Sequence, residues 1–205
     1  SWTPPDTSTP LGNADGGPCG SREEATLTWI LAQSCNTPFA QAAVELGQDE
    51  IRRAAERFGF NAGGSFPLPM AASVFPTDLD EAALAQSAIG QRDVQATALQ
   101  MNLVAAGIAH DGVVMEPQLV ESVRRPDLTT VRQFSPKERG RAASADVAEQ
   151  ITAMMEASVR EGVASGAASP RIAIAAKTGT AQIDGTDKVN SWITGFAPAD
   201  DPRVA

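Results

Sequence analysis

The chain has 205 residues, of which 42% are hydrophobic and 20% are charged, and its formal net charge is −9. No apolar run approaches the length of about eighteen residues that a membrane-spanning helix requires, so the composition is that of one globular domain or most of one. The negative charge argues against a nucleic-acid surface, because phosphate binding depends on clustered Lys and Arg. We therefore expect no nucleic-acid partner.

Histidine and cysteine are scarce in this sequence. The single histidine, His110, lies in a predicted surface turn after a helix, and one histidine cannot easily supply a Ser-His-Asp triad or a His-based zinc site. Cys19 and Cys35 are too few for a Cys-rich metal site, and we expect neither a metal nor a cofactor. The two cysteines could form a disulfide in an oxidising compartment or remain free, since spacing alone does not establish geometry.

The first half of the chain is predicted to be mainly helical. Residues 1–20 form an irregular lead-in rich in Pro, Gly, Asp and Asn, and residues 21–111 form the helical part. Ser21 and Glu24 form a capping box that predicts a helix running to about Gln33. Further helices are predicted at residues 37–46, 51–58, 78–87 and 94–108, with a long loop at residues 59–77.

Residues 112–205 are predicted to mix strands with one long helix. Short strands or a hairpin are expected at 113–115, 119–120 and 129–131, and Ser144 caps a predicted helix from Ala145 to about Glu161. A flexible link at 162–170 leads to a strand whose buried part is Ile172–Ala176. This strand reaches the surface at Lys177, and the Lys177–Gly179 motif lies on it where it leads into a hairpin. A hairpin turn at 184–187, a second strand at 190–197 and the start of a third at 204–205 complete the pattern.

The stretch Lys177-Thr178-Gly179-Thr180 carries a distinctive set of groups. Gly179 has no side chain and lets another backbone come close, while hydroxyls flank it on both sides and an ammonium precedes it. A strand edge with these groups suits an extended peptide that ends in a carboxylate.

A second short motif, Ser34-Cys35-Asn36, falls in a tight turn between two predicted helices. Ser-x-Asn alone is a weak signal, because a helix-capping turn would explain it without chemistry. Together with Lys-Thr-Gly it makes two of the three elements of the penicilloyl-serine transferases, whose third element is Ser-x-x-Lys.

On these motifs, the chain resembles the transpeptidase domain of a class B penicillin-binding protein, most like those of actinobacteria. The resemblance covers nearly the whole chain, through residues 33–39, 89–91, 97–101, 117–120, 177–182, 191–192 and 195–198. It implies an α/β (α+β) protein with a β-lactamase/transpeptidase-like fold, in which an antiparallel sheet is flanked by an all-helical subdomain. Residues 1–205 would be the C-terminal part of the domain, partial at both ends.

The sequence departs from the family pattern in one respect. No serine is followed three positions later by lysine, so the element that carries the nucleophile is missing. We interpret the chain as a segment of a longer protein whose upstream part holds this element. The alternative is a nucleophile-less homologue that acts as a cell-wall scaffold or binding protein.

The resemblance implies a peptidoglycan D,D-transpeptidase that cross-links stem peptides through a serine acyl-enzyme and is acylated by β-lactams. Ser34 would relay the proton to the leaving D-alanine, Asn36 would fix geometry, and Lys177 would raise the local positive potential. The hydroxyls of Thr178 and Thr180 would bind the substrate carboxylate. The backbone N–H of Thr180 would form half of the oxyanion hole.

Other interpretations of these residues remain open. Ser34 and Asn36 could only form the turn, and Lys177 could be a solvated strand end. A β-lactamase is a further alternative, but the class A route needs a glutamate downstream of Ser-x-Asn, and residues 57–77 hold no acidic side chain. The resemblance also implies other cell-wall synthesis or division proteins as partners, and a place on the extracytoplasmic face of the plasma membrane, anchored by an N-terminal helix outside this chain.

Overall fold

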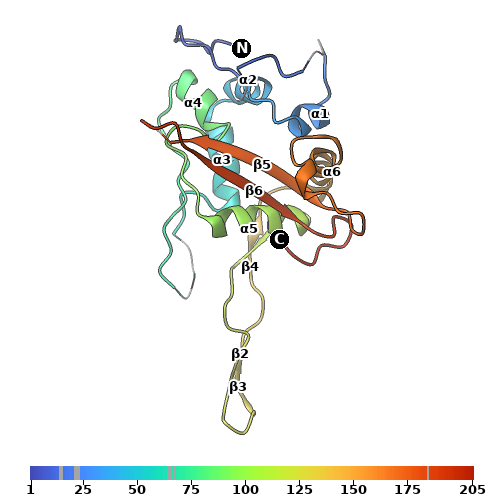
Figure 1. Cartoon of the computed structure of the whole chain (residues 1–205). Helices are drawn as coiled ribbons and strands as arrows, with labels where there is room; N and C mark the ends of the chain where they lie inside the picture. Colours follow the sequence, from blue (N-terminus) through green and yellow to red (C-terminus); the bar gives the residue numbers. More distant parts are fainter. Residues whose placement is uncertain (14–15, 21–23, 64–65, 67, 184) are drawn as a thin grey trace.

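The computed structural model describes residues 1–13, 16–20, 24–63, 66, 68–183 and 185–205. Its centre is a long antiparallel hairpin of β5 (Ala175–Gln182) and β6 (Val189–Phe196), with α5 (Ala98–Ala109) and α6 (Ala145–Glu161) packed against it. Figure 1 shows this hairpin crossing the molecule, with α5 below it and α6 at its right.

The remaining helices are α1 (Leu27–Ala32), α2 (Thr37–Leu46), α3 (Gln48–Phe58), α4 (Glu81–Ser87) and the short 3₁₀ helix η1 (Ser165–Ala167). α1 begins at Leu27, because the Thr26 side chain accepts a hydrogen bond from the backbone N–H of Trp29. The predicted capping residue, Ser21, lies outside the described residues, and the helix is shorter than predicted. α6 has the predicted bounds, and the Ser144 side chain accepts from Val147 N–H at its start.

α5 begins four residues later than the sequence pattern predicts. The segment before it is extended, since the backbones of Val74 and Gln95 pair through two hydrogen bonds of 2.7 and 3.0 Å. Thr97 then caps the helix by accepting from Gln100 N–H. Val94 is apolar and at helical spacing, but a strand-like pairing decides its conformation.

The β5–β6 pairing corrects the prediction for the central strand. Ala175 lies opposite Phe196 and the register continues to Gln182 opposite Val189, so the strand begins after Ile172 rather than at it. Ile172 is 45% exposed. The predicted start of the strand is therefore wrong, whereas the prediction that the Lys177–Gly179 motif lies on a strand leading into a hairpin is confirmed, since Lys177 is the third residue of β5 and the strand continues for five more.

Two smaller ladders complete the structure. β1 (Val113–Met115) pairs with β4 (Glu138–Arg141), and β2 (Ser122–Arg124) pairs with β3 (Thr130–Gln133). The strand predicted at residues 119–120 is wrong, since the ladder starts at Ser122. β4 was not predicted, because its polar sequence has no strand pattern and only its pairing with β1 makes it extended. The β2–β3 hairpin projects away from the body as a narrow arm (Figure 1).

The core places β5 in a fixed position. Ala105 of α5, Met155 of α6, Ala175 and Phe196 form one buried cluster between the two helices and the hairpin. Gly195 is required within it, since a Cβ at this position would clash with the carbonyl oxygen of Ala175. Small side chains therefore let the strands and helices approach closely, which holds the strand that carries Lys177.

Candidate active site

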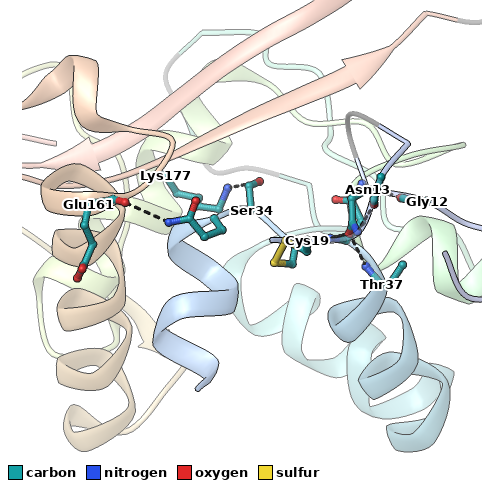
Figure 2. The surroundings of a disulfide bond; sticks show 11 residues. Gly12, Asn13, Cys19, Ser34, Thr37, Glu161 and Lys177 are labelled. Carbon is teal, nitrogen blue, oxygen red and sulfur yellow. Dashed lines mark hydrogen bonds between the residues drawn. A yellow bond between two sulfur atoms is a disulfide. The ribbon is translucent and has the colours of Figure 1, made fainter. Parts of the chain in front are cut away.

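Lys177 and Ser34 meet across the boundary between β5 and the turn after α1. The Lys177 ammonium donates to the Ser34 hydroxyl oxygen over 2.7 Å and to the carbonyl oxygen of Thr178 over 2.7 Å. The two motifs are 143 positions apart in the chain. Figure 2 shows the Lys177 side chain directed at Ser34. The fold thus brings the two sequence motifs into direct hydrogen-bonding contact.

Burial lowers the pKa of Lys177. Its side chain is half-buried between β5 and the α1 turn, and this desolvation lowers the pKa of the ammonium below the ordinary lysine value of 10.5. A lysine with a lowered pKa exchanges a proton more readily with a hydroxyl partner than a solvated lysine does. The pair Lys177–Ser34 is therefore suited to proton transfer as well as to attracting an anion.

The backbone at Ser34 aims its hydroxyl at Lys177. Ser34 has a φ of +57°, a left-handed conformation that few residues other than glycine adopt. Its N–H donates to Leu31 and the N–H of Cys35 donates to Ile30, each over 3.0 Å, so the turn closes the end of α1. The serine occupies a position that helix termination alone would assign to glycine or asparagine. A role for its hydroxyl would explain this choice.

The end of α6 fixes the end of α1 against the strand. Val163 N–H donates to the Ala32 carbonyl oxygen over 3.0 Å, and the Gln33 amide nitrogen donates to the Glu161 carbonyl oxygen over 3.0 Å. A Cβ at Gly162 would clash with the Ala32 carbonyl. The prediction of a flexible link over 162–170 is wrong at its start, where these residues are contact points that position the turn holding Ser34.

Asn36 is oriented by the lead-in. Its amide nitrogen donates to the Gly12 carbonyl oxygen over 3.2 Å, and its N–H donates to the Asn13 side-chain oxygen over 2.9 Å. The same Asn13 oxygen accepts from Thr37 N–H over 3.3 Å and so caps α2. Within the described residues no hydrogen bond joins Asn36 to Ser34 or Lys177. Asn13 was missed by sequence reasoning, because its partners lie 23 and 24 positions away.

The structure joins Cys19 to Cys35 in a disulfide with a Cα–Cα distance of 5.6 Å. Cys35 is the middle residue of the Ser-x-Asn turn and is 2% exposed. Figure 2 places this bond between Ser34 and Asn13, at the base of the turn. The lead-in that the sequence describes as irregular is therefore held to the turn by a covalent bond and by the Asn13 contacts.

The Thr178-Gly179-Thr180 stretch follows Lys177 along β5. Thr178 is half-buried and Thr180 is exposed. A Cβ at Gly179 would meet only Trp192 Cβ, at an ordinary 3.5 Å. Among the described residues, no backbone atom lies within 4 Å of the position that this Cβ would take, so packing within the chain does not explain this glycine. The face above it is left open.

The other features of the described residues do not indicate a second site that involves Ser34 or Lys177. Among the described residues, no group of three or more His, Cys, Asp or Glu is arranged to hold a metal ion. No helix in the described part of the chain is long and apolar enough to cross a membrane. A hollow of about 430 Å³ lies at the β5–β6 turn, lined by residues 182–183 and 185–189, but it includes neither Ser34 nor Lys177.

Comparison with known proteins identifies the family. The sequence model described as "Penicillin binding protein transpeptidase domain" matches residues 2–205. The chain belongs to the penicillin-binding-protein transpeptidase family. The resemblance inferred from the two motifs and the expected transpeptidase-like fold are thereby confirmed.

Several relatives of this transpeptidase-family chain are mycobacterial. It is 42% identical to the peptidoglycan D,D-transpeptidase PbpA of Mycolicibacterium smegmatis, and the match covers 98% of this chain and 42% of that protein. The identity to PbpA of Mycobacterium tuberculosis is 37%, with the same coverage. The chain thus spans about two fifths of the length of these relatives.

The similar solved structures are also penicillin-binding proteins. The ceftriaxone acyl-enzyme complex of M. tuberculosis penicillin-binding protein A superposes with a TM-score of 0.92 at 36% identity, covering 99% of this chain and 46% of that one. The M. tuberculosis penicillin-binding protein 3 complexed with aztreonam gives 0.76 at 26% identity, covering 87% and 43%.

Proposed function

We propose that this chain forms the substrate-binding part of a peptidoglycan D,D-transpeptidase that is also acylated by β-lactams. The observation that carries the proposal is the 2.7 Å hydrogen bond from Lys177 to Ser34, which joins the two family motifs in one site. Two relatives named as D,D-transpeptidases and a β-lactam acyl-enzyme of a structural relative support it.

The reaction divides a difficult amide exchange into two acyl transfers. A serine hydroxyl attacks the carbonyl of a D-Ala-D-Ala bond, the C–N bond breaks, and D-alanine leaves with the proton. An amine of a second stem peptide then attacks the acyl-enzyme and releases the serine. Since the chain holds no Ser-x-x-Lys sequence, we assign this nucleophile to a part of the protein outside these 205 residues.

Ser34 and Lys177 are the proton-transfer pair of this proposal. A hydroxyl donates and accepts at once, so Ser34 can pass a proton to the leaving amine while it receives one from its neighbour. Lys177 supports this role through its contact with the Ser34 oxygen and its lowered pKa. Its charge also attracts the carboxylate at the end of the donor stem peptide.

The strand that follows Lys177 binds the rest of the substrate. The hydroxyls of Thr178 and Thr180 hydrogen-bond the terminal carboxylate, and the open face at Gly179 admits the peptide beside the strand. The backbone N–H of Thr180 stabilises negative charge as it develops on the attacked carbonyl oxygen. Asn36 presents its side-chain oxygen to the lysine of the Ser-x-x-Lys element, because its amide nitrogen is held by Gly12.

The setting of this activity follows from the same proposal. The substrates are peptidoglycan stem peptides, and β-lactams are inhibitors that mimic them. Other cell-wall synthesis or division proteins are proposed as partners. We place the enzyme on the extracytoplasmic face of the plasma membrane, anchored by a segment outside this chain, and the Cys19–Cys35 disulfide suits such an oxidising compartment.

A nucleophile-less scaffold protein is the second candidate, since this chain has no Ser-x-x-Lys sequence. Incubation of the full-length protein with a fluorescent penicillin separates the two candidates. A covalent adduct, located by mass spectrometry on the serine of a Ser-x-x-Lys sequence, supports the transpeptidase. Full-length protein that forms no adduct and contains no such sequence supports the scaffold.

A further inference from the structure

The side chain of Gln91 occupies the edge of β5 that faces away from β6. Its amide nitrogen donates to the carbonyl oxygen of Thr180 over 3.1 Å, and its amide oxygen accepts from the N–H of Gln182 over 3.4 Å. One carboxamide thus takes both the acceptor and the donor that a further strand would use at this point. The Gln91 side chain therefore makes the two hydrogen bonds that the backbone of an added strand would make with β5 at this point.

The same edge is the one that the proposed function assigns to substrate. In a strand, the backbone groups of alternate residues point to the same edge, so Thr178, Thr180 and Gln182 present their N–H and C=O groups together. The Thr180 N–H, the proposed oxyanion donor, therefore lies next to the Thr180 carbonyl that Gln91 occupies. Gln91 thus hydrogen-bonds to the same residue whose N–H is proposed to form half of the oxyanion hole.

The turn after α4 holds Gln91 in this position. Gly90 has a φ of +76°, which lets the chain reverse after the helix, and Gln91 N–H donates to the Gln86 carbonyl oxygen over 3.1 Å. The preceding residue, Ile89, packs into the apolar cluster between α2 and α4. The sequence Ile89-Gly90-Gln91 thus supplies an anchor, a reversal and a carboxamide directed at the strand edge.

We propose that Gln91 is a specificity-determining residue of the transpeptidase site, which competes for the edge of β5 with ligands that carry an amide next to the attacked carbonyl. An extended peptide, or a β-lactam with an acylamino side chain, pairs with β5 only by taking the Thr180 carbonyl from Gln91. Such a ligand replaces the hydrogen bond that it breaks. A ligand without this amide leaves Gln91 in place. The inference rests on the proposed function and assigns this residue a part in substrate selection.

The test compares two β-lactams on the full-length protein. Benzylpenicillin carries an acylamino side chain, whereas penicillanic acid has hydrogen at the same position. Second-order rates of acylation are measured by competition with a fluorescent penicillin for the wild type and for Gln91→Ala. Removing the neutral hydrogen bond to the Thr180 carbonyl, which only benzylpenicillin must displace, should raise the ratio of its rate to that of penicillanic acid by about two- to tenfold.

Gln95→Ala is the matched control. Gln95 is exposed four residues further on, and it pairs with Val74 only through its backbone, which the substitution keeps. The control should keep the wild-type ratio. An unchanged ratio in Gln91→Ala, or an equal fall of both rates, would overturn the inference alone, because Gln91 would then be inert or only a support for β5. A wild type that neither compound acylates would overturn the proposed function as well.

Discussion

Replacement of Lys177 by methionine tests the proposed site most directly. The Lys177→Met substitution keeps most of the length of the side chain and its apolar character, and it removes the ammonium that donates to Ser34 and to the Thr178 carbonyl. Methionine fills the half-buried space with little change of volume. The expected effect is a loss of acylation with little loss of folding.

The size of the effect follows from the 2.7 Å contact with Ser34. A hydrogen bond to a charged group contributes about 1.5–3 kcal/mol, and each 1.36 kcal/mol in a barrier is tenfold in rate. If the contact acts mainly in the transition state, acylation by a penicillin should slow by about 10- to 150-fold. The free energy of unfolding should change by no more than about 1 kcal/mol, because removing a desolvated charge offsets the lost hydrogen bonds.

The assay is the second-order rate of labelling of the full-length protein by a fluorescent penicillin, with thermal unfolding measured in parallel. Lys188→Met is the matched control, since Lys188 is an exposed lysine in the β5–β6 turn. It should label at the wild-type rate. Undiminished labelling of Lys177→Met would refute the role of this residue. A variant that loses labelling only because it no longer unfolds cooperatively would show a structural role instead.

The lowered pKa of Lys177 adds a prediction about pH. Between this depressed pKa and the ordinary value of 10.5, the unfolded chain binds a proton that the folded chain does not. The contribution of Lys177 to stability therefore rises with pH across that window. Denaturant titrations should show this rise in the wild type and lack it in Lys177→Met. Equal pH slopes in both proteins would contradict the assignment.

Further substitutions test how the site is held. Gly195→Ala should destabilise the fold by about 1–3 kcal/mol in denaturant titrations, because its Cβ would clash with the adjacent strand, whereas Gly179→Ala should unfold like the wild type. Denatured, unreduced protein should release no thiol from Cys19 or Cys35, and the double serine variant should lose about 3 kcal/mol of stability; two free thiols would exclude the bond. Asn13→Ala should cost about 1 kcal/mol and slow labelling, and Asn13→Asp, which keeps the accepting oxygen, should restore the stability.

Local sequence signals identified several elements well. α6 was predicted with the correct bounds, because Ser144 caps it and its apolar residues keep helical spacing over four turns. β6 was predicted within one residue of each end, since it is rich in aromatic and β-branched side chains. These signals act over a few residues and can be read directly from the chain.

Other boundaries could not be read in this way. The apolar run at 172–174 looks more strand-like than Thr178–Gln182, yet β5 consists of the residues that β6 pairs. β4 is extended only because β1 lies beside it. In both cases the backbone hydrogen bonds come from a segment far away in the sequence, so side-chain pattern alone could not decide the conformation.

The sequence by itself determined the family to which this chain belongs. Ser34, Asn36 and the Lys177–Gly179 motif are local groups of residues, and their identity alone pointed to the family that the comparison identified. Only the tertiary structure decided how they are assembled. The Lys177–Ser34 contact, the Asn13 cap and the Gln91 side chain on the edge of β5 each join residues more than twenty positions apart, and chain folding alone sets such distances.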